Sequence, residues 1–323
     1  MSAKLSASCE TAMASERNTF LGVAACDLAL PVPLPPGEAD IVIFGAADAT
    51  PHLKGRTSHA ANGPTAIRNA LRVYQTDLAR WDFDQDGILL DPEQIRVVDG
   101  GDLATSPDAP EQNRKAIRTA TKKILKSGAV PMLLGGDDSV PIPFFEAFED
   151  MGRLTILQID AHLDWKDRRD GSAHTFSSTM RRASELPWVE RIVQVGLRGV
   201  GGSGPQELSC ARNWGSRIFT ARDVRSLGVQ AVLSAIEDNA NCLITIDCDG
   251  LDPSVIPGVL LPQPGGLSYF DVVDLIAGIA SKARIVGLDL VELVPERDLQ
   301  NIGAICAARI ICNAIGHIAK QKR

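Results

Sequence analysis

The fold of this 323-residue chain is constrained most by a series of short apolar runs that alternate with helical patterns. The runs are rich in β-branched residues and nearly continuous in their hydrophobicity, which is typical of strands buried on both faces of a parallel sheet. The alternation predicts a three-layer α/β/α fold with a mostly parallel sheet of about eight strands. Predicted strands begin at Ile41, Ile95, Val130, Leu154, Arg191, Arg217, Cys242 and Arg284, and predicted helices span 65–81, 111–127, 178–186, 222–238, 268–282 and 299–321.

The sequence predicts one domain, residues 39–323, because neither an internal repeat nor a second boundary is visible. Residues 1–38 differ from the rest: Ser, Ala and Thr dominate at first, and the segment LPVPLPPGEAD then contains four prolines. Such a segment can form neither a helix nor an inner strand. We therefore expect residues 1–38 to form a flexible, Pro-rich arm.

Composition excludes several classes of protein. The formal net charge of -7, without a basic cluster, argues against nucleic-acid binding. The apolar stretches have the length of strands, so we expect no membrane contact and a cytoplasmic location. The seven cysteines form no CxxC pair, which argues against both a disulfide framework and a zinc ribbon.

Acidic side chains directly follow three of the predicted strands. In QIDAHLD, Asp160, His162 and Asp164 occupy alternate positions, so in an extended segment they point the same way. Asp247 and Asp249 follow another strand, and the segment GGDDS, which contains Asp137 and Asp138, follows a third. The carboxyl ends of parallel strands border the functional crevice of such sheets. Unpaired carboxylates there would repel one another, and bound dications would remove the repulsion.

The chemistry of these ligands favours particular ions. Carboxylate oxygens with one imidazole suit Mn²⁺ or another borderline ion such as Ni²⁺ or Co²⁺ better than a thiolate zinc site or a calcium cage. A pair of such ions lowers the pKa of a shared water toward neutrality. The pattern therefore predicts hydrolysis.

Each signal also has a simpler interpretation. A single DxHxD is most often a solvated acidic loop, and GGDDS could be a tight turn with a helix cap. His174 lies in a polar segment where a surface histidine is an alternative, while His52, His59 and His317 lack ligand spacing and are interpreted as non-functional. No nucleotide-binding pattern follows the two glycines of GGDDS. Three clusters on three apolar strands nevertheless favour a metal centre.

The three acidic segments, GGDDS, DAHLD and TIDCDGLDPSVIPG, resemble the metal-binding signatures of the ureohydrolase family, the arginase and agmatinase group. GPTAIR, QVGLRG, PQPGGL and GLDLVELVPERD support the resemblance, which spans roughly residues 40–315. It implies a three-layer α/β/α fold, a binuclear manganese-type centre and hydrolysis of a guanidinium carbon–nitrogen bond.

The resemblance also implies roles for individual residues. It assigns one ion to Asp138, Asp160, Asp164 and Asp247, and the other to Asp160, His162, Asp247 and Asp249. It makes Glu292 the carboxylate that anchors the guanidinium. It makes His174 the proton-transfer histidine, although the segment AHTFSSTMRRA is longer by two residues than the family pattern.

Two segments depart from the family pattern. GGDD replaces the usual GGDH, so Asp138 stands where an imidazole is usual and the ligands become five carboxylates and one histidine. This extra charge should favour harder ions and make bound water less acidic. GVLLPQPGGL replaces GTGTPEPGGL, which predicts a more apolar substrate wall at Val259, Leu260 and Leu261.

These patterns lead to one prediction and one alternative. We expect a binuclear hydrolase, with two Mn²⁺ or Ni²⁺ ions, that cleaves a small cationic guanidino substrate of the agmatine, guanidinobutyrate, guanidine or alkylbiguanide type. It would release urea or a urea derivative and an amine without a covalent intermediate on a serine or cysteine. Related enzymes lead us to expect a homo-trimer or hexamer. The alternative is a metal-deficient structural subunit that pairs with an active homologous subunit in a hetero-oligomer.

Overall fold

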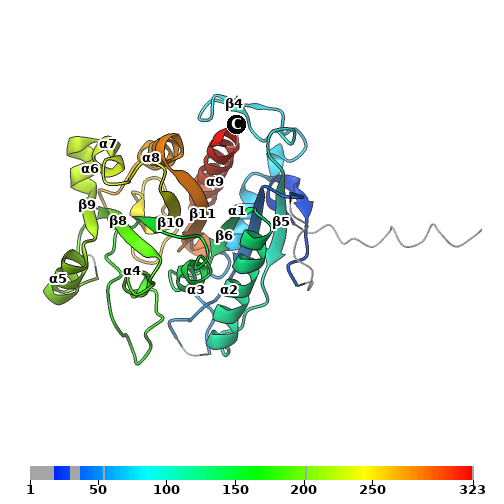
Figure 1. Cartoon of the computed structure of the whole chain (residues 1–323). Helices are drawn as coiled ribbons and strands as arrows, with labels where there is room; N and C mark the ends of the chain where they lie inside the picture. The colour runs from blue at the N-terminus through cyan, green and yellow to red at the C-terminus, as the bar shows by residue number, and fades with distance from the viewer. Residues whose placement is uncertain (1–17, 30–36, 54, 201, 322–323) are drawn as a thin grey trace, which may run out of the picture.

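The computed structural model describes residues 18–29, 37–53, 55–200 and 202–321 (Figure 1). Its centre is a nine-stranded sheet in which every neighbouring pair of strands is parallel. The strand order is β1-β5-β2-β6-β11-β10-β7-β8-β9. The strands are β1 (Ala24–Ala25), β2 (Ile41–Ala46), β5 (Val97–Asp102), β6 (Val130–Gly135), β7 (Leu154–Ile159), β8 (Val189–Leu197), β9 (Arg217–Thr220), β10 (Asn241–Asp247) and β11 (Arg284–Val291).

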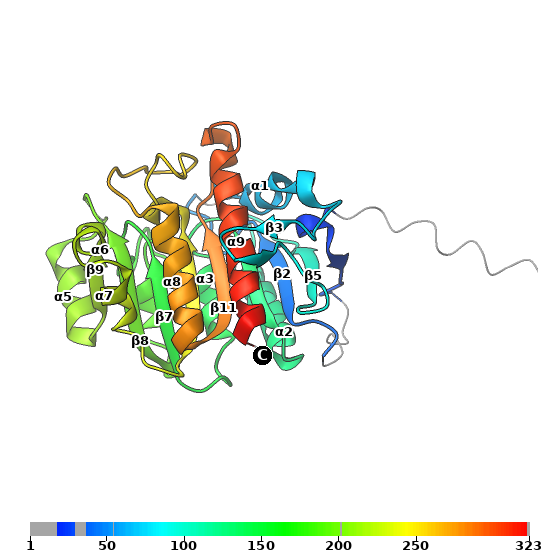
Figure 2. The ribbon, with the colours of Figure 1, turned by 90° about the horizontal axis from the view of Figure 1, so that it is seen from above.

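Alternating side chains of the strands build two hydrophobic cores, one on each face of the sheet. In β2, Ile41 and Ile43 belong to one core, and Val42 and Phe44 belong to the other. The helices that cover the first face are α1 (Gly63–Ala70), α6 (Ala221–Leu227), α7 (Val229–Leu233), α8 (Tyr269–Lys282) and α9 (Ile302–Gln321). Those that cover the second are α2 (Pro110–Lys126), α3 (Pro141–Glu146), α4 (Thr179–Ala183) and α5 (Pro205–Trp214). Figure 2 shows α8 and α9 on one side of the strands and α2 and α3 behind them, so the predicted three-layer fold is confirmed.

The helices differ from their predicted ranges for local reasons. The predicted helix 222–238 divides into α6 and α7 at Gly228, whose φ of 76° lies in the left-handed region and cannot continue a helix. The predicted helix 65–81 ends at Ala70, where the chain enters the 3₁₀ helix η2 (Arg72–Tyr74). Helices α3 and α5 were not predicted, although each begins with a proline, a residue favoured at the first helical position.

Part of the expected arm belongs to the fold. Phe20 and Leu21 are buried, and β1 adds a short strand to the edge of the sheet beside β5. The backbone N–H of Phe20 donates to Oδ2 of Asp99, 2.8 Å away. The contact explains why this segment packs on the domain. Residues 1–17 and the proline run at 30–36 lie outside the described residues, so the rest of the arm stays a prediction.

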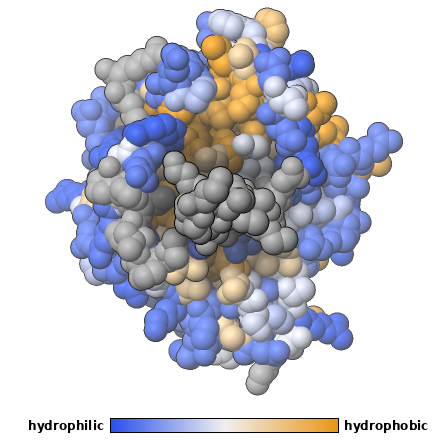
Figure 3. Space-filling model, turned by 90° about the vertical axis from the view of Figure 1, so that its right-hand side faces the viewer, coloured by the Kyte–Doolittle hydropathy of each residue, from blue (hydrophilic) through white to orange (hydrophobic). Residues whose placement is uncertain are grey.

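A small antiparallel hairpin, β3 (Trp81–Asp82) paired with β4 (Gly87–Ile88), lies outside the main sheet and was not predicted. The two terminal guanidinium nitrogens of Arg309 in α9 donate to Asp82, at 2.5 and 2.7 Å, and hold the hairpin on the domain. The hairpin exposes Trp81 (57%) and Phe83 (89%). Figure 3 shows apolar side chains gathered in the upper part of the face that it draws.

Helix α9 is long and apolar enough to cross a membrane by length and composition, and no other helix among the described residues is. However, 72% of its most apolar window is buried inside the structure. It contacts both α8 and α1. Helix α9 is therefore a core helix of the domain.

We predict that a buried ion pair stabilises the edge where β1 joins the sheet. Arg68 donates to both carboxylate oxygens of Asp99, at 2.8 and 3.1 Å, and both side chains are almost completely buried. Asp99→Ala would leave the Arg68 charge without this partner, so the free energy of unfolding should fall by roughly 3–5 kcal/mol in urea denaturation. Glu190→Ala is the control, because Glu190 pairs with Arg153 at the surface and should matter by less than about 1 kcal/mol. Equal effects of the two substitutions would contradict the prediction.

Candidate metal centre

Four neighbouring strands in the middle of the sheet, β6, β11, β10 and β7, end at the same edge. Each is followed by acidic residues that were singled out in the sequence. Asp138 follows β6, and Glu292 follows β11. Strand β10 ends at Asp247, with Asp249 two residues later. The residues after β7 are Asp160, His162 and Asp164. Parallel pairing places all these segments on one side, so residues from distant parts of the sequence meet. We call Asp138, Asp160, His162, Asp164, Asp247 and Asp249 the metal centre.

Two groups within the metal centre have the spacing of metal ligands. Ligand atoms of Asp160, His162 and Asp249 lie within 4.8 Å of one another, and so do those of Asp138, Asp160 and Asp164. Asp160 belongs to both groups. In the first group, Nδ1 of His162 lies 3.0 Å from Oδ2 of Asp249 and 3.5 Å from Oδ1 of Asp160. Two ligand groups that share one carboxylate suit a pair of ions.

Asp247 lies beside these groups without belonging to either of them. It is the last residue of β10 and is buried, and its Oδ1 accepts the backbone N–H of Asp249 at 2.7 Å. Its charge helps to raise the pKa of Asp160. Burial is the main cause of the raised pKa of Asp247, and the charges of nearby carboxylates, Asp138 among them, raise it further.

The electrostatics of the centre call for added positive charge. Burial, followed by the charges of neighbouring carboxylates, raises the pKa values of Asp138, Asp160 and Asp247 well above the ordinary value of an aspartate. Burial lowers the pKa of His162, but the hydrogen bond to Asp249 and nearby negative charges outweigh it and raise this pKa to about 9. One imidazolium cannot neutralise five carboxylates.

The donor atoms fit divalent cations. Oδ2 of Asp138 is buried, and no hydrogen-bond partner for it exists among the described residues. A buried carboxylate oxygen without a partner is costly, and a bound cation would satisfy it. The remaining donors are carboxylate oxygens and one imidazole nitrogen, which suit Mn²⁺ or Ni²⁺. The residues present therefore fit a pair of such ions.

Two buried glutamines orient the carboxylates of Asp160 and Asp164 through hydrogen bonds. Nε2 of Gln158 donates to Oδ2 of Asp160 at 2.7 Å and to Oδ2 of Asp164 at 3.0 Å. Nε2 of Gln194, in the neighbouring strand β8, donates to Oε1 of Gln158 at 2.6 Å, which fixes the orientation of that amide. Supporting hydrogen bonds of this kind hold metal ligands in place.

Arg198, in the segment QVGLRG, holds the loop after β10. Its guanidinium donates to the backbone carbonyls of Asp249 at 2.6 Å, Gly250 at 3.1 Å and Leu251 at 3.0 Å. It also donates to the carbonyl of Gln263, at 2.8 and 3.1 Å. The planar guanidinium thus ties the Asp249 loop to the PQPGGL segment.

Glu292 is hydrogen-bonded to the loop that carries Asp138. Its φ of 64° is unusual for a residue with a side chain, and its backbone N–H donates to the carbonyl of Gly136 at 2.8 Å. Its Oε1 accepts the backbone N–H of Asp138 at 2.9 Å. Strained backbone of this kind persists where surrounding contacts enforce it, often at functional sites.

His59 is a residue of this site that the sequence analysis missed. Its Nε2 lies 2.5 Å from Oε2 of Glu292, although the two residues are 233 positions apart in the sequence. His59 was interpreted as non-functional because it lacks ligand spacing. Its place just before GPTAIR, one of the segments that carry the family resemblance, was the signal that could have found it.

His174 lies in the loop between β7 and α4 and is partly buried. Burial, followed by the charges of Arg114, Arg182 and Arg168, lowers its pKa. Among the residues that the structure describes, no hydrogen bond or ion pair joins its ring to the metal centre. Its role in proton transfer therefore stays a prediction.

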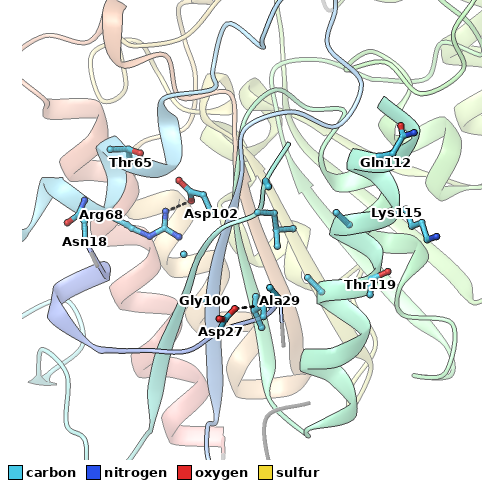
Figure 4. A pocket seen from close by; sticks show the side chains of 16 residues that line it. Asn18, Asp27, Ala29, Thr65, Arg68, Gly100, Asp102, Gln112, Lys115 and Thr119 are labelled. Atoms are coloured by element: carbon cyan, nitrogen blue, oxygen red, sulfur yellow. Dashed lines mark hydrogen bonds and ion pairs between the residues drawn. The ribbon is translucent and has the colours of Figure 1, made fainter. Parts of the chain in front are cut away.

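The pocket shown in Figure 4, of about 880 Å³, is separate from the metal centre. It lies between β5, α2 and residues 27–29, and none of the predicted ligands lines it. Arg68, on its wall, already pairs with Asp102 and Asp99. This pocket is therefore not the candidate active site.

Comparison with known proteins identifies the family. Residues 39–316 match the arginase family, and the chain belongs to it. Within this family it is an agmatinase-like ureohydrolase, and so an enzyme, which confirms the resemblance seen in the sequence.

Three similar proteins show the extent of the match. The N(1)-aminopropylagmatine ureohydrolase of Thermus thermophilus is 32% identical over 260 residues, which cover 80% of this chain and 83% of that protein. The guanidinobutyrase of Pseudomonas aeruginosa is 27% identical over 225 residues, or 68% of this chain and 70% of that protein. The solved proclavaminate amidino hydrolase of Streptomyces clavuligerus has a TM-score of 0.78 and 25% identity, and the match covers 94% of this chain and 97% of that chain.

We predict that Asp138 is a metal ligand. Asp138→Ala removes one carboxylate donor and should reduce the metal content from two ions per chain to about one, whereas Asp138→His supplies a nitrogen donor and should keep both. Inductively coupled plasma mass spectrometry on manganese-loaded protein measures the content. The control is Asp137→Asn, which keeps the oxygen that accepts from Ser139 and should retain both ions. Unchanged metal content in Asp138→Ala would show that Asp138 is not a ligand.

We also predict that removal of metal makes stability strongly pH-dependent. Asp138, Asp160, Asp164 and Asp247 have raised pKa values in the fold. Their stabilising contribution is complete below about pH 4, the unfolded pKa, and is lost as the pH rises through the folded values. The pKa of Asp249 is lowered instead, so its stabilising contribution is present at neutral pH and is lost only as the pH falls into the acid range. The metal-free protein should therefore lose Tm in scanning calorimetry as the pH rises above about 4, the unfolded pKa, while the loaded protein should not. Parallel Tm curves would contradict this prediction.

Proposed function

We propose that this chain uses two divalent ions, Mn²⁺ or Ni²⁺, to hydrolyse the guanidinium carbon–nitrogen bond of a small guanidino compound, releasing urea or a urea derivative and an amine. The observation that carries the proposal is the meeting, at one edge of the sheet, of an acidic metal centre and a separate buried carboxylate, Glu292. The names of the relatives, which include a guanidinobutyrase and a ureohydrolase of N(1)-aminopropylagmatine, support the same chemistry.

The metal centre would hold the two ions in overlapping sets. Asp138, Asp160, Asp164 and Asp247 would hold one ion, and Asp160, His162, Asp247 and Asp249 the other. When bound, such ions acidify water and stabilise negative charge that develops during hydrolysis. Gln158 orients the carboxylates of Asp160 and Asp164, and Arg198 holds the backbone of the Asp249 loop.

Glu292 would bind the guanidinium. Its carboxylate is 7% exposed, so a charge-assisted hydrogen bond to a substrate cation would be stronger there than in water. Donors already hold both of its oxygens in place. The substrate's reactive carbon would then lie at the edge of the sheet that carries the metal centre.

His174 would transfer the proton to the leaving amine. Its lowered pKa keeps the ring mostly neutral at pH 7, so it must first accept a proton, for example from the attacking water, before it can donate one. Direct attack by water requires no nucleophile on Ser139, Ser177 or a cysteine. Each of these side chains should be dispensable as a nucleophile.

The guanidino group defines the proposed class of substrates. Of the apolar run expected to line the substrate wall, Val259 is buried in the core and Leu261 is 55% exposed. The proposed substrates therefore remain the set that shares the guanidinium: agmatine, guanidinobutyrate, guanidine and alkylbiguanides. A cytoplasmic location and a trimeric or hexameric assembly also remain predictions.

The test combines metal analysis with urea release from this panel of compounds. Asp247→Ala should lose both ions and turnover, because its carboxylate would belong to both proposed ligand sets. Glu292→Gln should keep the ions but lose most turnover, and His174→Ala should keep the ions while kcat falls by about 10²–10⁴.

Three other outcomes would contradict parts of the proposed function. Full activity of Asp247→Ala would contradict the binuclear mechanism. Full kcat in His174→Ala would assign proton transfer to another group. Wild-type protein that retains no metal and releases no urea would instead support the alternative, a structural subunit that pairs with an active homologous one.

A further inference from the structure

We propose that His59 is a positioning residue for the substrate anchor: it holds the Glu292 carboxylate in the orientation that receives the guanidinium. This inference rests on the proposed function, because it assumes that Glu292 binds the substrate. It adds a role for a residue that lies outside all the metal-binding segments.

The contact is short and sheltered. Nε2 of His59 lies 2.5 Å from Oε2 of Glu292, and the two side chains are 18% and 7% exposed. A hydrogen bond to a charged group in such surroundings is stronger than one between neutral groups. The contact therefore restricts the side chain of Glu292 more firmly than an exposed pair would.

The two donors leave room for the substrate. The backbone N–H of Asp138 occupies Oε1 of Glu292, and His59 occupies Oε2. Each carboxylate oxygen can accept two hydrogen bonds, so one acceptor position remains on each oxygen. Two N–H groups of a guanidinium match two parallel acceptor positions. His59 and Asp138 thus fix the plane of the carboxylate and leave its second pair of acceptor positions free.

The fold holds His59 in this place from several directions. Asp48 accepts from Oγ1 of Thr57 at 2.7 Å and from the backbone N–H of Ser58 at 2.6 Å, which fixes the loop. After the loop, Gly63 passes so close to the end of β11 that a Cβ there would lie 3.0 Å from the carbonyl of Leu293. The ring of Phe176 meets the His59 imidazole edge-on, with 6.1 Å between centroids.

A different role for His59 would have the opposite effect on substrate binding. As an imidazolium, His59 could occupy the anchor and compete with the substrate for Glu292. Its loss would then strengthen binding and lower KM. If His59 instead positions the anchor, its loss frees the Glu292 side chain and raises KM. The direction of the KM change separates the two roles.

The experiment compares three variants of the metal-loaded protein. His59→Leu keeps an apolar side chain of similar size but removes the donor, and KM should rise about ten- to a hundredfold while kcat changes much less. His59→Gln restores an amide donor near the position of Nε2 and should recover most of this loss. His52→Leu is the control, because His52 contacts the same Phe176 ring but not Glu292, and its KM should stay unchanged.

A second measurement does not depend on turnover. Isothermal calorimetry with guanidinium chloride, at millimolar concentrations, should show weaker binding to His59→Leu than to the wild type, and thermal unfolding and metal content should confirm that the variant is folded and loaded. An unchanged or lower KM in His59→Leu, or equal loss in the Leu and Gln variants, would overturn the inference and leave the proposed function standing. Wild-type protein that neither releases urea nor binds guanidinium would overturn the proposed function, and this inference with it.

Discussion

Mutual repulsion among buried carboxylates is the constraint on which the rest of this structure depends. Five aspartates crowd around one histidine at one edge of the sheet, and burial raises the pKa of most of them. Such a cluster is costly without bound cations. The fold can tolerate the cost because the strands beneath it are almost fully buried on both faces, between two hydrophobic cores. The buried strands thus stabilise the fold enough to hold the repelling carboxylates together.

Close packing and backbone strain concentrate at the same edge. A Cβ on Gly136 would lie 1.9 Å from the carbonyl of Ala47, so only glycine allows the loop after β6 to pass the loop after β2. Asp164 and Glu292 have φ values of 48° and 64°, which residues with side chains rarely adopt. At this edge the backbone N–H of Asp138 donates to the carboxylate of Glu292.

The site divides into two parts with different electrostatic demands. The ligand carboxylates fit cations, whereas the oxygens of Glu292 are already held by the backbone N–H of Asp138 and the ring of His59. Under the proposed function, this division would let one edge of the sheet hold ions and a substrate cation side by side. The break at Gly228 within the predicted helix 222–238 shows that backbone conformation also shapes regions far from the site.

The sequence by itself determined the elements and the acidic strand ends, because both depend on local patterns. Apolar runs identified the eight main strands of the parallel sheet, and Asp160, His162 and Asp164 followed one of them at alternate positions. Only the tertiary structure decided which strands are neighbours. β10 and β11 insert between β6 and β7, which brings Asp247, Asp249 and Glu292 between segments that lie far before them in the sequence. It also decided the place of His59, because a contact with Glu292 across 233 positions leaves no local periodicity. Short-range patterns report backbone preference and burial, whereas a site assembled across a sheet depends on strand order.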